Sequence, residues 1–149
     1  QKQAKEEPDV LPQNAAEFKG KHILLAEDNE LNSEIATTLL EEQGASITAV
    51  ENGRLALDAI QNAAPRTYDA ILMDVMMPEM NGLEATRCIR AFEGKGPGEG
   101  TPIIAMTANA FPEDMALSRH AGMNEHLSKP LRENELLKTI RRYVKSRSC

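Results

Sequence analysis

The sequence predicts an α/β fold, a flavodoxin-like doubly wound sheet of five parallel strands in the order 2-1-3-4-5 with five helices. Short apolar runs alternate with stretches of helical periodicity from Lys21 onward, which is typical of βαβ units. Charged residues follow directly after three of these apolar runs. Because the carboxyl ends of parallel strands face one crevice, we expect these charges to converge there.

The expected elements alternate strictly along the chain. Strands are predicted at His22–Ala26, Ser46–Val50, Ala70–Asp74, Ile103–Thr107 and Glu125–Ser128. Helices are predicted at about Glu30–Gln43, at Gly53–Asn62, from near Gly82, at Phe111–Gly122 and at about Glu133–Tyr143. The 149 residues suit one domain and can bury a core without a disulfide or a structural metal.

Periodicity and stop signals justify these elements in turn. The first helix carries Leu31, Ile35 and Leu39 at four-residue spacing, and Gly44 follows as a C-terminal stop. The third strand is apolar up to its last residue, so we expect it at the centre of the sheet. Pro102 opens the fourth strand, and the later helices repeat apolar residues at helical spacing.

Residues 1–20 differ from the rest of the chain. They are rich in Lys, Glu and Gln, contain Pro8 and Pro12, and show no periodic apolar pattern. We predict that they form a disordered linker or tail and that the folded domain occupies residues 21–149. Such a tail suggests a module tethered to something larger on its N-terminal side.

Composition excludes several classes of protein. A formal net charge of -6 argues against a nucleic-acid partner, because phosphates call for a basic surface. No apolar run approaches the roughly 20 residues of a membrane span, so no direct membrane contact is expected. Cys88 and Cys149 form neither a ligand pair nor a disulfide framework, which favours a reducing, cytoplasmic setting.

The strand ends supply a candidate site. Glu27, Asp28 and Asp74 are expected to meet in one crevice, where three anions would repel unless a cation lay among them. Mg²⁺ fits because it prefers oxygen ligands and keeps several waters. Asp74, at the end of the central strand, is a candidate nucleophile toward a phosphoryl group. Lys129 and Thr107 can then bind phosphoryl oxygens.

Simpler explanations compete with this site. An Asp after a strand is often only the N-cap of the next helix, and Lys129 before Pro130 resembles an ordinary loop lysine. The glycine-rich stretch 94–101 lacks the Lys-Ser or Lys-Thr of a phosphate loop and precedes a strand, so we predict a flexible loop. Capping alone is a weaker explanation for charges that stand together at the ends of three predicted strands.

Four motifs together resemble the response-regulator receiver domains of two-component signalling. They are Glu27-Asp28-Asn29, the segment Ile71 to Gly82, the run Ile103 to Ala108, and Lys129-Pro130. The resemblance covers roughly Lys21 to Val144. Among receivers, this chain is most similar to the C-terminal receiver of a hybrid sensor histidine kinase. It implies that Asp74 takes a phosphoryl group from a phosphohistidine with Mg²⁺, and then relays it or switches conformation.

The same resemblance assigns roles to individual residues. Asp28 would bind Mg²⁺ directly and Glu27 through water, together with Asp74 and the backbone carbonyl of Met76. Thr107 would be the switch hydroxyl and Lys129 the cation paired with the acidic cluster, followed by a cis bond to proline. The implied partner is a histidine kinase or a histidine phosphotransfer domain, and the implied oligomeric state is a monomer. Enzymatic activity would be limited to self-phosphorylation and autodephosphorylation.

One position departs from the resemblance, and other functions stay open. Receivers usually carry Tyr or Phe three residues before the lysine, where this chain has His126. A phosphatase of the haloacid-dehalogenase type would need an acid two residues after Asp74, where Met76 stands. A flavin or nucleotide binder and a phosphorylation-silent interaction module are the remaining alternatives, as is a free-standing regulator in place of a hybrid kinase.

Overall fold

A computed structural model describes residues 17–64, 66–108 and 111–147. Within them five strands form one sheet, namely β1 (His22–Ala26), β2 (Ser46–Val50), β3 (Ala70–Asp74), β4 (Ile103–Thr107) and β5 (Glu125–Ser128). Neighbouring strands all pair in parallel, and the order across the sheet is β2-β1-β3-β4-β5. This confirms the predicted fold class and strand order.

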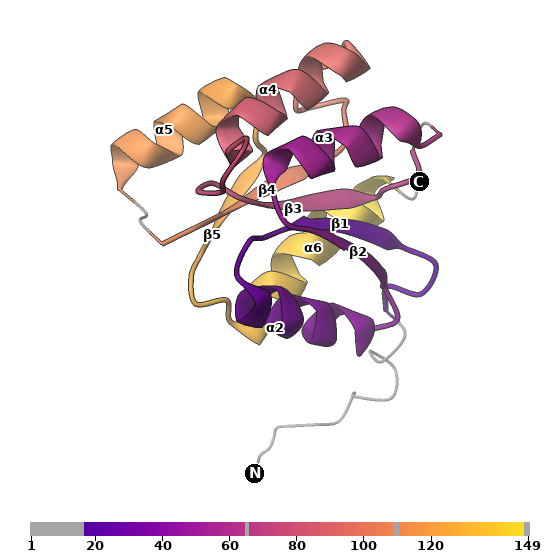
Figure 1. The fold of residues 1–149 in the computed structure, drawn as a ribbon. Coiled ribbons are helices and arrows are strands. Elements are labelled where there is room, and N and C mark those ends of the chain that lie inside the picture. The colour runs from indigo at the N-terminus through magenta and orange to yellow at the C-terminus, as the bar shows by residue number, and fades with distance from the viewer. Residues whose placement is uncertain (1–16, 65, 109–110, 148–149) are drawn as a thin grey trace.

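Helices cover both faces of the sheet. They are α2 (Glu30–Glu41), α3 (Gly53–Asn62), α4 (Gly82–Glu93), α5 (Pro112–Ala121) and α6 (Glu133–Arg147). Figure 1 shows α2 and α6 on one side of the sheet and α3, α4 and α5 on the other. Each face of the sheet has its own hydrophobic core, and successive strand residues point into opposite cores. Leu25 and Leu72 pack beneath α2 and α6. Leu24 and Ile71 pack beneath α3 and α4.

The central strand is the most deeply buried. All five residues of β3 are buried, while the edge strand β2 is only partly covered. A strand that is covered on both faces has apolar residues along its whole length. This is why the apolar run at β3 predicted a central position in the sheet. The fold therefore brings the last residue of β3, Asp74, to the middle of the carboxyl edge of the sheet.

Helices α2, α3 and α4 each begin at an asparagine N-cap, a few residues after the strand that precedes them. The side chains of Asn29, Asn52 and Asn81 each accept a hydrogen bond from the backbone N–H three residues later. At α4 the cap is reciprocal, because the Glu84 carboxylate accepts from the Asn81 N–H at 3.4 Å. These caps satisfy backbone groups at the helix starts and fix the loops that surround the carboxyl edge.

The apolar face of α2 is only partly covered. Ala36 and Leu40 are fully buried, but Leu31 and Ile35 are 63% and 41% exposed. Helical periodicity identifies an apolar face without showing how much of it the sheet covers. The first two turns of α2 thus leave apolar side chains exposed beside the carboxyl edge.

The end of the predicted linker packs on the domain. Phe18 is fully buried in the core beneath α2 and α6, and its backbone N–H donates to the Gln43 carbonyl at 2.8 Å. Glu17 accepts a hydrogen bond from Arg141 Nη2 on α6 at 3.1 Å. Residues 17–20 form a turn, and the rest of the predicted linker, residues 1–16, lies outside the described residues.

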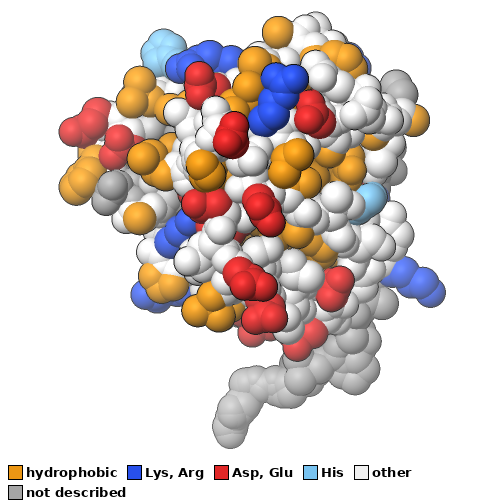
Figure 2. Space-filling view, in the orientation of Figure 1, with side chains coloured by type: hydrophobic (Ala, Val, Ile, Leu, Met, Phe, Trp, Pro, Cys, Tyr) orange, Lys and Arg blue, Asp and Glu red, His pale blue; other side chains and the backbone are white. Residues whose placement is uncertain are grey.

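The surface agrees with the acidic composition. In Figure 2 acidic side chains run down the middle of the visible face, with hydrophobic side chains between them. Among the residues that the structure describes, no helix has the length and apolar character needed to cross a membrane.

Candidate functional site

The fold brings the predicted charges together at the carboxyl edge of the sheet. Glu27 and Asp28 follow β1, and Asp74 ends β3 beside it. Each offers a carboxylate oxygen, and these three oxygens all lie within 4.8 Å of one another. Glu27 and Asp74 are each only 4% exposed, whereas Asp28 is exposed. The convergence expected from strand ends is therefore present.

Lys129, directly after β5, joins this cluster. Its Nζ lies 2.9 Å from Asp74 Oδ2 and 2.9 Å from Glu27 Oε1. The contact with Asp74 is a hydrogen bond, whereas Glu27 Oε1 is buried and makes no well-oriented hydrogen bond within the described chain. The bond between Lys129 and Pro130 is cis, as the resemblance implied. One lysine thus pairs with two of the three carboxylates.

Backbone amides hold the two buried carboxylates in place. The Asn29 N–H donates to Glu27 Oε2 at 3.1 Å, and the Met76 N–H donates to Asp74 Oδ1 at 3.3 Å. Each acid is therefore held from two directions, by a backbone amide and by Lys129. Such fixed geometry favours binding or reaction at the site over a simple capping role.

Electrostatics show that the cluster is short of positive charge. Burial raises the pKa of the Glu27 carboxyl above its ordinary value, and the contacts with Lys129 and Asn29 oppose that rise. Burial alone would lower the pKa of Lys129, but its contacts with Asp74 and Glu27 outweigh this and raise it. Lys129 therefore stays charged at neutral pH, and one cation cannot balance three carboxylates.

The donor set fits a hard divalent cation. Three carboxylates within 4.8 Å of one another, two of them buried, can hold such an ion. The Met76 side chain is 76% exposed, and its backbone N–H already contacts Asp74. The role of its carbonyl as a ligand stays a prediction.

Close backbone packing positions Asp74. A Cβ added to Gly82 would lie 2.3 Å from the Asp74 carbonyl oxygen, so only glycine fits where α4 begins. The Gly82 N–H donates to the Val75 carbonyl at 3.0 Å, and the Val75 N–H donates to Met106 of β4 at 3.1 Å. The start of α4 and the end of β4 together fix the loop that follows Asp74.

Thr107 and His126 lie on one side of the crevice. Thr107 ends β4 and is half-buried, and both residues line a small cavity of about 70 Å³ beneath α5. The Nε2 atom of His126 is enclosed and has no hydrogen-bond partner within the described residues. Burial, and then the nearby Arg119, lowers the pKa of this imidazole. His126 is therefore neutral at neutral pH and packs inward.

Sequence reasoning missed the role of Arg90. This arginine of α4 is 8% exposed and donates to the Gly122 carbonyl, the Thr101 carbonyl and Asn124 Oδ1, each at 2.9 Å. The glycine-rich stretch was predicted as a flexible loop, yet Asn124 Nδ2 donates to the Pro97 carbonyl at 2.7 Å and anchors it. No sequence signal marks these acceptors, because they come from segments far from Arg90.

Comparison with protein families agrees with this geometry. The family model described as the response regulator receiver domain matches residues 23–141. The chain therefore belongs to the response-regulator receiver family. A curated relative, the sensor histidine kinase GacS of Pseudomonas protegens, is 35% identical over 133 residues, which are 89% of this chain but 14% of GacS. The chain thus spans a small part of that relative.

Two solved structures illustrate the similarity. The receiver domain of sensor histidine kinase PA1611 from Pseudomonas aeruginosa, with a magnesium ion coordinated in its active-site cleft, is 39% identical. The match covers 85% of this chain and 98% of that one, with a TM-score of 0.74. The receiver of Saccharomyces cerevisiae Ssk1, solved with the histidine phosphotransfer protein Ypd1, is 27% identical, with coverages of 89% and 94% and a TM-score of 0.79.

Proposed function

We propose that Asp74 accepts a phosphoryl group from a phosphohistidine, with Mg²⁺ held by Glu27, Asp28, Asp74 and the Met76 backbone carbonyl. The observation that carries this proposal is the acidic cluster itself, three carboxylates within 4.8 Å with Lys129 Nζ 2.9 Å from two of them. The magnesium in the PA1611 receiver supports the choice of metal.

The chemistry is a transfer between two nucleophiles. An Asp74 carboxylate oxygen forms a bond to phosphorus while the P–N bond to the donor imidazole breaks, and that electron pair stays on the imidazole nitrogen, which takes up a proton. Mg²⁺ supplies charge that neutralises the transferring oxygens. The Lys129 ammonium and the Thr107 hydroxyl donate hydrogen bonds to the resulting acyl phosphate. Attack of water on that product later returns Asp74 and phosphate.

A small phosphodonor tests the proposal directly. The full chain is incubated with acetyl phosphate and Mg²⁺, and intact-mass spectrometry counts the phosphoryl groups gained. We expect one group on the wild type, none on Asp74→Asn and none in excess chelator. Asp58→Asn, which removes a partly exposed carboxylate on α3, is the matched control and keeps full labelling. Undiminished label on Asp74→Asn would show that another residue is the acceptor.

We also propose that a histidine phosphotransfer domain or a histidine kinase docks beside the crevice. Leu31 and Ile35 are exposed on the first turns of α2, and Ile35 lines a small hollow together with Glu27 and Lys129. Apolar side chains adjoining the reactive groups give a partner an anchoring surface that leaves the phosphoryl path open. The Ypd1 complex of the Ssk1 receiver supports this class of partner.

Comparing two donors separates docking from chemistry. Leu31→Ala with Ile35→Ala should slow transfer from a phosphorylated histidine phosphotransfer domain by about tenfold or more, while uptake from acetyl phosphate stays unchanged. Leu55→Ala, which also truncates an exposed leucine, serves as the control. Equal slowing with both donors would mean that the pair supports the reactive groups and does not form a docking surface.

The relatives of the chain support a proposal for its setting. We infer that it is the receiver of a hybrid histidine kinase that passes its phosphoryl group onward, because GacS and PA1611 are both sensor histidine kinases. Phosphorylation adds a charge near -2 at the crevice. A near-complete conformational switch needs about 5.5 kcal/mol of differential stabilisation, which a few charge-assisted hydrogen bonds from Thr107 and Lys129 can reach.

A further inference from the structure

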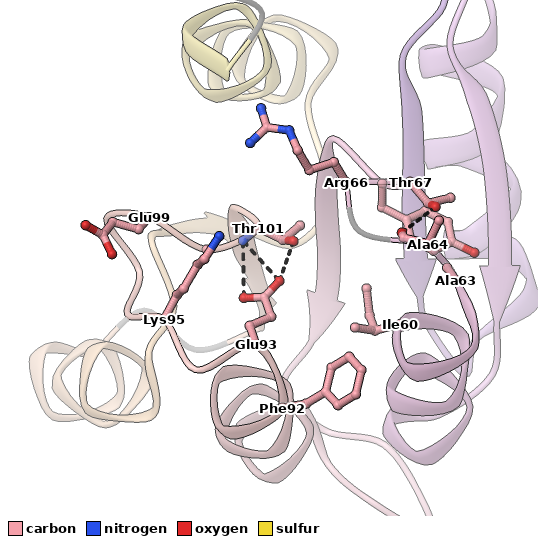
Figure 3. A pocket seen from close by; sticks show the side chains of 12 residues that line it. Ile60, Ala63, Ala64, Arg66, Thr67, Phe92, Glu93, Lys95, Glu99 and Thr101 are labelled. Carbon is pink, nitrogen blue, oxygen red and sulfur yellow. Dashed lines mark hydrogen bonds between the residues drawn. The ribbon is translucent and has the colours of Figure 1, made fainter.

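Helices α3 and α4 pack differently at their two ends. A cavity of about 380 Å³ opens between their C-terminal ends, and Figure 3 shows Ile60 of α3 and Phe92 of α4 among its walls. At the N-terminal ends, a Cβ added to Gly53 of α3 would lie 3.0 Å from the Cβ of Ala85 on α4, closer than ordinary van der Waals contact. The N-terminal ends therefore leave no space for a side chain at Gly53.

Gly53 also packs on the loop that follows Asp74. Its backbone N–H donates to the Met80 carbonyl at 2.9 Å. Because Gly53 is the first residue of α3, this N–H has no partner within the helix, and Met80 satisfies it. A Cβ on Gly53 would collide with the Met80 carbonyl oxygen and would lie 2.9 Å from the Asn81 carbonyl oxygen. The first turn of α3 thus holds residues 75–81 through a close backbone contact that only glycine allows.

The middle of this loop is exposed and strained. Met76, Pro78 and Glu79 are exposed. Glu79 has a φ of 67°, a left-handed conformation that is costly for a residue other than glycine. The Met80 N–H donates to the Pro78 carbonyl at 2.7 Å and closes a tight turn. A turn of this kind depends on support from neighbouring elements, and Gly53 supplies it at Met80.

A side chain at Gly53 should displace the loop and leave α3 in place. Leu57 and Ile60 anchor α3, because both are buried in the core that α3 shares with α4. Asp74 is the buried last residue of the central strand β3, so it is also held firmly. The exposed loop between these fixed parts carries Met76, whose N–H donates to Asp74 Oδ1 at 3.3 Å. Displacing the loop would therefore move the Met76 backbone relative to Asp74.

We propose that Gly53 is a positioning residue for the metal site, because the first turn of α3 holds the loop that presents the Met76 carbonyl to Mg²⁺. This inference rests on the proposed function, in which that carbonyl is a ligand. Mg²⁺ demands near-ideal octahedral geometry, so a displaced carbonyl weakens binding even when every carboxylate keeps its place. Gly53 acts through Met80 and the loop and contacts neither the metal nor the phosphoryl group.

A titration of the full chain with Mg²⁺, followed through backbone amide chemical shifts, tests the proposal. In Gly53→Ala, the amide shifts of residues 75–81 should differ from wild type before metal is added, and the half-saturating Mg²⁺ concentration should rise about tenfold. Arg54→Ala on the same turn is the matched control, because its side chain is 63% exposed and pairs only at the surface with Asp58. It should change neither quantity.

Phosphorylation kinetics separate positioning from chemistry. With acetyl phosphate and saturating Mg²⁺, the rate for Gly53→Ala should stay within about twofold of wild type, because Asp74 and Lys129 keep their places, whereas the Mg²⁺ needed for half the maximal rate should rise about tenfold. A merely structural role would lower the free energy of unfolding without changing the Mg²⁺ affinity of the folded protein.

A milder variant keeps the test decisive if Gly53→Ala folds poorly. Asn52→Ala removes the side-chain oxygen that caps the same turn by accepting from the Leu55 N–H at 2.9 Å. The first turn then frays more readily, and the half-saturating Mg²⁺ concentration should rise about threefold.

The proposal is wrong if folded Gly53→Ala and Asn52→Ala both bind Mg²⁺ like wild type, or if Arg54→Ala weakens binding as much as they do. It is also wrong if the metal-free amide shifts change along α3 but not at residues 75–81. A wild type that does not respond to Mg²⁺ would refute the proposed metal itself. That failure is distinguishable, because the other outcomes are measured against a wild type that responds.

Discussion

Replacing Lys129 by Met should reveal how strongly the acidic cluster depends on its one ammonium group. Methionine keeps an unbranched apolar stem and removes the charge that lies 2.9 Å from both Asp74 and Glu27. At an effective dielectric constant of about 20, two carboxylates 4.8 Å apart repel by about 3.5 kcal/mol. Breaking a buried ion pair costs about 3 to 5 kcal/mol, and because Lys129 keeps 19% exposure we expect the lower figure, about 3 kcal/mol.

The assay is urea unfolding at neutral pH, with chelator and again with saturating Mg²⁺. Because the pKa of Lys129 in the fold lies above its ordinary value, its stabilisation is complete below the unfolded pKa and is lost only as the pH rises through the folded one. A divalent cation binds the more negative variant site more tightly, so Mg²⁺ should narrow the gap to wild type by more than about 1 kcal/mol. Lys138→Met, at an exposed site, is the control.

Three outcomes would refute this reasoning. A loss below about 1 kcal/mol in chelator would mean that the carboxylates tolerate one another without Lys129. A gap that Mg²⁺ leaves unchanged would mean that Lys129 does not weaken cation binding among these carboxylates. Mg²⁺ that stabilises neither protein would mean that the cation does not bind there, which would remove the basis for the metal in the proposed reaction.

Three further changes probe the fold around the site. Phe18→Ala should lower the free energy of unfolding by about 3 to 5 kcal/mol in urea titrations, because that ring is fully buried, and a loss like that of exposed Phe111→Ala would contradict this. Gly82→Ala should slow phosphoryl uptake from acetyl phosphate by about tenfold or more, since the new Cβ would push against the Asp74 carbonyl, and an unchanged rate would show that the loop can yield. The pKa of His126 is lowered in the fold, so stability should fall as the pH drops below about 6.5, and His126→Phe should reduce that dependence. If the free energy of unfolding changed with pH in the same way for this variant and the wild type between about pH 5.5 and 7.5, the imidazole would not cause the loss of stability at low pH.

Much of the fold followed from local pattern. The strand bounds were predicted because each apolar run is short and ends at a charge or a turn residue, and the strand order followed from the few topologies that parallel βα units allow. The convergence of Glu27, Asp28, Asp74 and Lys129 was predictable for the same reason, since the carboxyl ends of parallel strands must share one edge.

Other features depend on contacts that no local pattern records. Periodicity marked an apolar face on α2 but could not show that Ile35 stays partly exposed beside the crevice. A helical arginine is ordinarily on the surface, and Arg90 is buried only because Gly122 and Asn124 supply acceptors from more than thirty residues away. The cavity between the C-terminal ends of α3 and α4 could not be predicted for the same reason, because its walls come from two separate helix-to-strand connections.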